Sequence, residues 1–176
     1  MKTVCLSLIA CAAAALLVPA ATAQQPPKPG PEHEHLKRLE GTWEATIKMG
    51  DQESKGTMKY KMGLGGLWLI SDLDGEFGGM KFSGKGLDTY DPSAKKYRTI
   101  WADSMSTAPM IMQGTFDKDS KTMTMTGEGP GQDGKTAKFK TTTEIKDSDT
   151  MLFSLYAVGE GGKDQPMIKI TYKRKK

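Results

Sequence analysis

The feature that most constrains this chain is an alternation of apolar and polar side chains with a period of two, which begins at Gly41 and continues almost to the C-terminus. In "TWEATIKM", for example, Trp43, Ala45 and Ile47 alternate with polar neighbours, as expected of a strand with one buried face. About ten such segments, this one included, are separated by turns rich in Gly, Asp, Pro and Ser. We therefore predict an all-β fold, a single antiparallel up-and-down barrel of about ten strands, because closure removes the exposed edges of an open sheet.

The N-terminus has the features of a secretory signal. A lysine precedes an apolar run, and Ala21-Thr22-Ala23 fits the small-x-small rule, which predicts a signal over residues 1–23 and export to the periplasm or out of the cell. The alternative is a lipoprotein signal with Cys11 lipidated. A proline-rich linker over residues 24–33 and a barrel domain over residues 34–176 follow, and "EHEHLKRLEG" predicts one or two helical turns before the first strand.

The composition excludes several kinds of chemistry. Both cysteines, Cys5 and Cys11, lie in the predicted signal, so the mature chain has no thiol for a disulfide, a nucleophile or a zinc site. Both histidines, His33 and His35, precede the first strand, so a Ser-His-Asp triad, a histidine-zinc centre or a histidine-ligated haem inside the barrel is excluded. We expect them to be solvated, and we predict no cofactor and no metal.

The charge and hydropathy patterns bear on partners. A formal net charge of +4, spread along the chain apart from the terminal "KRKK", predicts no nucleic-acid partner. The mature chain contains no run typical of a transmembrane segment. The oligomeric state is left open by the sequence.

One short motif resembles a known superfamily. Gly41-Thr42-Trp43 resembles the G-x-W of the calycins, which include the lipocalins and the fatty-acid-binding proteins. In that superfamily the tryptophan closes one barrel end beneath a basic residue of the last strand. The resemblance implies that Arg174 or Lys173 has this role.

A longer series of motifs, "LGGLWLI", "GKGLDTYDPSAKKY", "WADSMST", "GTFD" and "ITYKRK", resembles domain-of-unknown-function family 1579, exported calycin-like barrels of bacteria. The family typically has Arg where Leu67 stands and Gly where Thr89 stands, so Leu67 removes a possible interior cation. The resemblance implies a calycin-like barrel and no established activity.

Trp101 and Asp103 are the first candidate site residues. A period of two puts both on the face of Tyr97, and the opposite register would bury Arg98, which is costly unless it is paired. We therefore expect Trp101 and Asp103 to point inward. The hydrogen-bond donors expected for Asp103 are Ser104, Ser106 or Thr107, and the alternative role for Asp103 is to cap the turn at "DSMST". Four other carboxylates are equally well explained as solvated strand-end residues: Asp72, Asp74, Glu76 and Asp88.

Alternating methionines are the second candidate feature. Met110 and Met112 lie on one predicted strand and Met123 and Met125 on the next, so the pairs can meet across a hairpin. Thioethers bind Cu(I), but methionines at alternate strand positions more often fill a core or line a pocket. We therefore predict that they form, with Phe116, an apolar wall opposite Trp101.

Three functions are compatible with these residues. The first is a barrel that binds a small apolar or amphipathic ligand, because ten strands can enclose a cavity; Trp101 and the methionines would contact its body and Asp103 its polar end. The second is an enzyme that uses Asp103 as a lone acid or base. The third is a ligand-free structural protein of the envelope with a filled barrel. The first is preferred, and no residue is assigned as catalytic.

Overall fold

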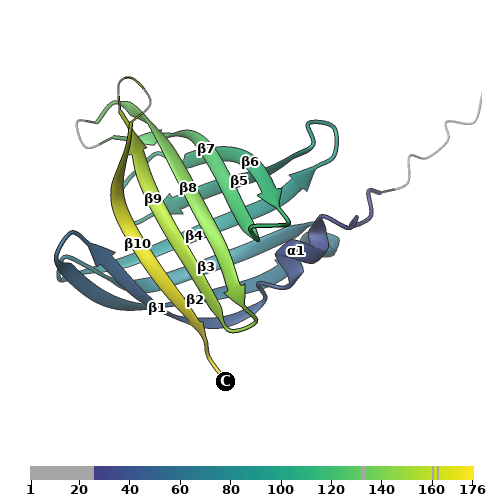
Figure 1. Ribbon diagram of the computed structural model, residues 1–176, viewed down its shortest axis with the longest axis horizontal. Coiled ribbons are helices and arrows are strands. Elements are labelled where there is room, and N and C mark those ends of the chain that lie inside the picture. The colour runs from purple at the N-terminus through teal and green to yellow at the C-terminus, as the bar shows by residue number, and fades with distance from the viewer. Residues whose placement is uncertain (1–25, 132–133, 160, 162) are drawn as a thin grey trace, which may run out of the picture.

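The computed structural model describes residues 26–131, 134–159, 161 and 163–176; the predicted signal lies outside them. One helix, α1 (His33–Lys37), precedes ten strands, and a 3-10 turn (Leu64–Gly66) lies between the second and third. The strands (Figure 1) are β1 (Gly41–Met49), β2 (Gln52–Gly63), β3 (Trp68–Phe77), β4 (Met80–Asp91), β5 (Lys96–Asp103), β6 (Met110–Asp117), β7 (Thr122–Pro130), β8 (Thr136–Asp147), β9 (Thr150–Val158) and β10 (Asp164–Arg174). Among the described residues, no helix has the length and apolar character needed to span a membrane.

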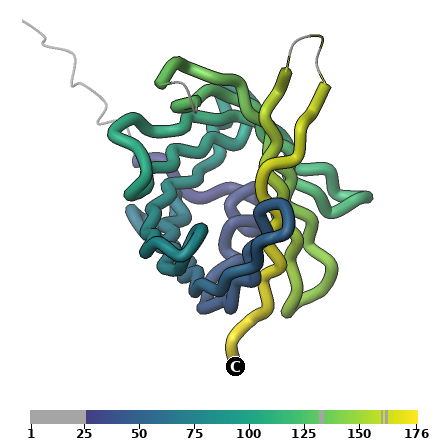
Figure 2. The backbone as a smooth tube through the Cα atoms, turned by 90° about the vertical axis from the view of Figure 1, so that its left-hand side faces the viewer, coloured from purple at the N-terminus to yellow at the C-terminus, as the bar shows by residue number. Residues whose placement is uncertain are grey.

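The ten strands form a closed antiparallel barrel, as the alternation predicted. Each strand pairs with the next along the chain, and β10 returns to pair with β1. At this seam Ala45 lies opposite Tyr172 and Ile47 opposite Ile170. Figure 2 shows the blue first hairpin and the yellow last strand meeting there. The sheet therefore has no free edge strand.

The inner face of the barrel carries two apolar clusters. The first gathers buried residues of β1–β4, β9 and β10 around Trp43, Ile47 and Met151, each 1% exposed. The second joins Leu36 of α1 to residues of β3 and β5–β8, including Met112, Met125 and Phe139. The partly buried Tyr60 packs against both clusters. Polar inner-face residues thus lie among apolar surroundings.

Arg174 and Trp43 close one end of the barrel. The guanidinium carbon of Arg174 lies 4.0 Å from the centroid of the Trp43 ring, and the guanidinium donates hydrogen bonds to the carbonyls of Arg38, Glu40 and Ser148. The indole Nε1 of Trp43 donates to the carbonyl of Leu39 at 2.9 Å.

The contact between Arg174 and Trp43 also explains the residues beside them, Gly41 and Lys173. Gly41 has a φ of +124°, and a Cβ atom there would lie 2.8 Å from a guanidinium nitrogen of Arg174, which accounts for a glycine before the tryptophan. Lys173 points to the outside and bonds Thr150. Of the two basic residues considered, Arg174 is the one over the tryptophan.

Helix α1 lies across the same end, against β2, β3 and β4. The expectation that both histidines are solvated was wrong for His33, which is 6% exposed. Its Nδ1 accepts a hydrogen bond from the backbone N–H of Gly30 at 3.0 Å, and its ring meets Tyr90 edge-on at 6.4 Å. His35 stacks on Phe116 with ring centroids 4.4 Å apart. Packing of the helix onto the barrel therefore removes His33 from water.

Candidate functional site in the barrel interior

Trp101 lies against the inner wall of β4. Register places it opposite Gly86, and a Cβ atom on the neighbouring inner-face residue, Gly84, would overlap the indole ring. The two glycines therefore leave room for the large ring to lie against the sheet. The ring is partly exposed although it faces inward. Trp101 is thus a flat apolar surface on the wall.

Asp103 also faces inward, but with other donors than those expected. Its Oδ2 accepts a hydrogen bond from Nε1 of Trp101 at 2.9 Å, and its Oδ1 accepts one from the backbone N–H of Met105 at 2.9 Å. The hydroxyl of Ser104 instead accepts from the backbone N–H of Ser83. Since both carboxylate oxygens are engaged, Asp103 orients the indole and caps the turn after β5. Arg98 lies outside the barrel, where it pairs with Asp91.

The methionines line the next part of the wall, on β6 and β7, interleaved with glycines. Met112 lies opposite Gly127, and Met125 lies opposite Gly114, so the two methionine pairs are offset diagonally. Phe116 lies opposite Met123. Met112 and Met125 are buried, whereas Met110, Met123 and Phe116 are partly exposed.

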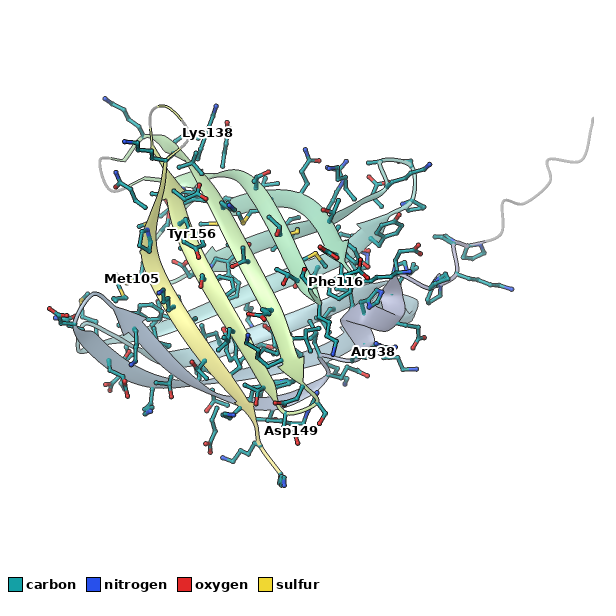
Figure 3. All side chains as sticks on the ribbon, viewed as in Figure 1. Arg38, Met105, Phe116, Lys138, Asp149 and Tyr156 are labelled. Carbon is teal, nitrogen blue, oxygen red and sulfur yellow. The ribbon has the colours of Figure 1, made fainter. Side chains whose placement is uncertain are left out.

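The two ends of this part of the barrel differ. Figure 3 shows Phe116 beside α1 and Met105 at the opposite end. A surface concavity of about 1350 Å³ opens at the end away from α1, between the β1–β2 and β3–β4 hairpins. Its lining includes the inner-face residues Ser54, Gly56 and Phe82. One end is therefore covered by α1 and Arg174, and the other end is hollowed.

Asp88 is the inner-face group that sequence reasoning missed. The sequence explains it equally well as a solvated strand-end residue, but register places it opposite Thr99, in phase with Gly86 and Trp101 on the inner face. The hydroxyl of Thr99 donates a hydrogen bond to its Oδ1. Burial raises the pKa of Asp88 from its ordinary value of 3.8 to about 6, and the Thr99 hydrogen bond offsets part of that rise. The signal that could have found it is the continuous alternation from Phe82 to Tyr90.

The other three carboxylates weighed with Asp88 differ from it. Asp72 pairs with Lys85 on the outer face, and Asp74 and Glu76 are exposed.

Two tyrosine hydroxyls lie in the same interior. Burial raises the pKa values of Tyr60 and Tyr172, and for Tyr60 the charges of Tyr172 and Asp88 raise it further. Among the described residues, neither hydroxyl forms a hydrogen bond, and neither does Oδ2 of Asp88. The one fully enclosed unpartnered side-chain atom in the described part of the chain is Nε2 of His33. The two hydroxyls and Oδ2 of Asp88 are therefore inner-face oxygens that have no partner among the described residues and are not fully enclosed.

Among the described residues, no cation balances Asp88 from within the barrel. In the strands that the structure describes, register puts Arg174 on the inner face and the lysines on the outer face. Arg174 is already held over Trp43 and by three carbonyls. Among the described residues, no group of three or more His, Cys, Asp or Glu could hold a metal ion.

The motif series and the barrel together identify the family. A family described as "Protein of unknown function (DUF1579)" matches residues 28–174, almost the whole described chain. The chain belongs to the DUF1579 family. A search of curated protein sequences found no match to this DUF1579 protein.

Solved structures of other barrels share the fold of the DUF1579 chain. Rv2717c from M. tuberculosis is 16% identical with a TM-score of 0.60, and the match covers 84% of this chain and 99% of that one. The S-type phycobiliprotein lyase CPES from Guillardia theta is 11% identical with a TM-score of 0.54, covering 82% of this chain and 93% of that one. At these identities the likeness shows a common barrel fold.

Proposed function

We propose that this DUF1579 barrel binds one small amphipathic ligand in its interior. The observation that carries the proposal is the set of inner-face oxygens on Tyr60, Asp88 and Tyr172 that have no hydrogen-bond partner among the described residues. Polar groups inside proteins are nearly always paired with protein or with ordered water. Oxygens that the barrel leaves unpaired are therefore available to water or to a ligand.

The apolar part of the ligand has a suitable surface beside these oxygens. Trp101 lies against its glycine-lined wall, and Met110, Met112 and Met125 continue that wall on β6 and β7. Unbranched thioether side chains adapt to ligands of different shape, and a mostly apolar pocket with a few placed polar groups is typical of small-molecule sites. Asp103 supports this wall by its hydrogen bond to Trp101.

The two barrel ends suggest the direction of entry. Helix α1 covers one end, while the concavity of about 1350 Å³ lies at the other. We propose that the ligand enters through that mouth. We further propose that the predicted signal exports the protein, so that the ligand is one met in the periplasm or outside the cell.

A neutral fluorescent probe tests the binding function. N-Phenyl-1-naphthylamine is uncharged at neutral pH, and its fluorescence rises when it leaves water. Titrating it into the protein should give saturable binding with one site per chain, and energy transfer from tryptophan to the probe places that site near the indoles. A wild-type protein that shows no saturable binding would refute the proposed function.

A matched pair of variants tests the wall. Trp101→Ala removes the inward indole and should weaken probe binding by about tenfold, since truncating a buried aromatic contact typically costs more than 1 kcal/mol. Ile100→Ala alters the adjacent outer-face residue, which is 40% exposed, and should leave binding unchanged. Equal affinities of the two variants would remove Trp101 from the site while leaving the function standing.

A further inference from the structure

The inner face presents one carboxylate that the protein itself leaves half paired. Thr99 donates to Oδ1 of Asp88, whereas Oδ2 has no partner among the described residues and is not fully enclosed. The other inward carboxylate, Asp103, has donors on both oxygens. Among the described inward carboxylates, Asp88 is therefore the one that has an oxygen without a hydrogen-bond donor.

This charge lacks a counter-charge inside the described barrel. The inner-face cation, Arg174, is held at the closed end over Trp43. The pKa of about 6 leaves Asp88 mainly ionised at neutral pH. Folding has already removed the carboxylate from bulk water, so a cation that reaches it does not add that desolvation cost again.

Two aromatic side chains lie near Asp88 on the inner face of the barrel. Trp101 lies one inner-face position along β5 from Thr99, the residue opposite Asp88. Tyr60 lies opposite Ser71, and Ser71 lies opposite Gly86, the next inner-face residue to Asp88. Aromatic faces attract ammonium groups, and a tyrosine hydroxyl can accept a hydrogen bond from one.

We infer that Asp88 anchors an amphipathic amine, whose protonated nitrogen pairs with the Asp88 carboxylate while its apolar body lies along Trp101 and the methionines of β6 and β7. This inference rests on the proposed binding function and specifies its ligand class. It also excludes fatty acids and other carboxylates as preferred ligands, because the interior offers them a negative charge and no free cation among the described residues. The affinity expected for an uncharged alcohol with the same alkyl chain lies between those of the amine and the carboxylate.

Three ligands that differ only in their head groups test this inference. Octylamine, octanol and octanoate are titrated into the wild-type protein by calorimetry at about pH 7.5. Octylamine should bind about tenfold or more tightly than octanol, as expected of a charge-assisted hydrogen bond, and octanoate should bind most weakly. Equal affinities for the three, or preference for octanoate, would overturn the inference.

Two isosteric variants show which carboxylate causes the preference for octylamine over octanol. Asp88→Asn keeps the shape of the side chain and should reduce octylamine affinity to about that of octanol, a loss of about tenfold, while octanol affinity stays within about twofold. Asp103→Asn, at the other inward carboxylate, should weaken octylamine and octanol binding alike through Trp101, and should keep the ratio between the two affinities. Loss of the preference in the Asp103 variant but not in the Asp88 variant would assign the amine to Asp103 and overturn the inference.

The two proposals fail differently. If the neutral naphthylamine probe binds but octylamine has no advantage over octanol, the barrel binds ligands and Asp88 is not an amine anchor. If neither the probe nor any octyl ligand binds the wild-type protein, the binding function itself is wrong.

Discussion

A desolvated carboxylate with no counter-charge among the described inner-face residues should cost the protein stability, and Asp88→Asn should recover it. The substitution removes the charge while an amide oxygen can still accept the hydrogen bond of Thr99. Burial raises the pKa of Asp88 from 3.8 to about 6, so between these values the folded state binds the proton more tightly than the unfolded state does. The stability contributed by the protonated group is complete below about pH 4 and is lost as the pH rises through about 6.

The size of the effect follows from the displacement of the pKa. A change from 3.8 to about 6 corresponds to about 3 kcal/mol, and the partial solvent exposure of Asp88 lowers that figure. Urea unfolding, followed by circular dichroism, should therefore show the Asp88→Asn variant to be more stable than wild type by about 1–3 kcal/mol at neutral pH. The difference should shrink to near zero at about pH 4.

The control is Asp72→Asn, which alters an outer-face carboxylate of the neighbouring strand that pairs with Lys85. It should give no gain at neutral pH, since exposed ion pairs contribute little. An Asp88→Asn variant that is less stable than wild type at neutral pH, or a difference that does not change between pH 4 and pH 7, would refute the view that an ionised, desolvated Asp88 lies inside the barrel.

Three further changes test the parts of the barrel that frame the interior. Arg174→Ala removes the contact with Trp43 and the bonds to three carbonyls, and should lower the free energy of unfolding by about 2–4 kcal/mol, measured in urea. Gly84→Ala places a methyl group into the Trp101 ring, and should cost about 1–3 kcal/mol and change the tryptophan emission. Hydrogen bonds from Ser93, Arg98 and the Ala94 backbone lower the pKa of Asp91 to about 2, so the stability it contributes is present above 3.8 and is lost as the pH falls through about 2. Asp91→Asn should therefore be less stable than wild type near neutral pH, and thermal melts should show the difference shrinking as the pH falls through about 2.

Each of these variants has a control variant at an exposed position. Lys173→Ala and Ser83→Ala alter exposed outer-face residues beside Arg174 and Gly84 and should change stability by less than about 0.5 kcal/mol. Asp119→Asn alters an exposed carboxylate in the turn between β6 and β7. It is the control for Asp91→Asn and should also change stability by less than about 0.5 kcal/mol. An Arg174→Ala variant as stable as the Lys173→Ala variant would show that the closed end needs no cation, and an unchanged emission spectrum for Gly84→Ala would show that the indole does not lie on that glycine.

The sequence was sufficient for the barrel and for the inward direction of its residues because both depend on local alternation. A period of two decides which face each side chain takes, and the cost of burying Arg98 was enough to choose the face of Trp101 and Asp103. The same rule applied to Gly84 and Gly86 would have placed Asp88 inside. The turn residues that begin at Asp91 made that segment resemble a strand end.

What the sequence could not give depends on contacts between distant segments. His33 is buried because α1 packs on the barrel beside Tyr90, and no pattern within five helical residues encodes that. Ser104 was an expected donor to Asp103, but its hydroxyl oxygen accepts from the backbone N–H of Ser83 on the adjacent strand. The donors that Asp103 has, Nε1 of Trp101 and the N–H of Met105, lie only two residues away in the sequence. Partner choice in a barrel follows register, which becomes known only when the strands are paired.

The native mass of the full-length protein, expressed with its N-terminal segment and measured before and after incubation with octylamine, tests the central claim most directly. The account predicts one small organic molecule per chain, either carried through purification or acquired from the octylamine, and lost when the protein is unfolded. A mass equal to that of the bare chain under both conditions would contradict it.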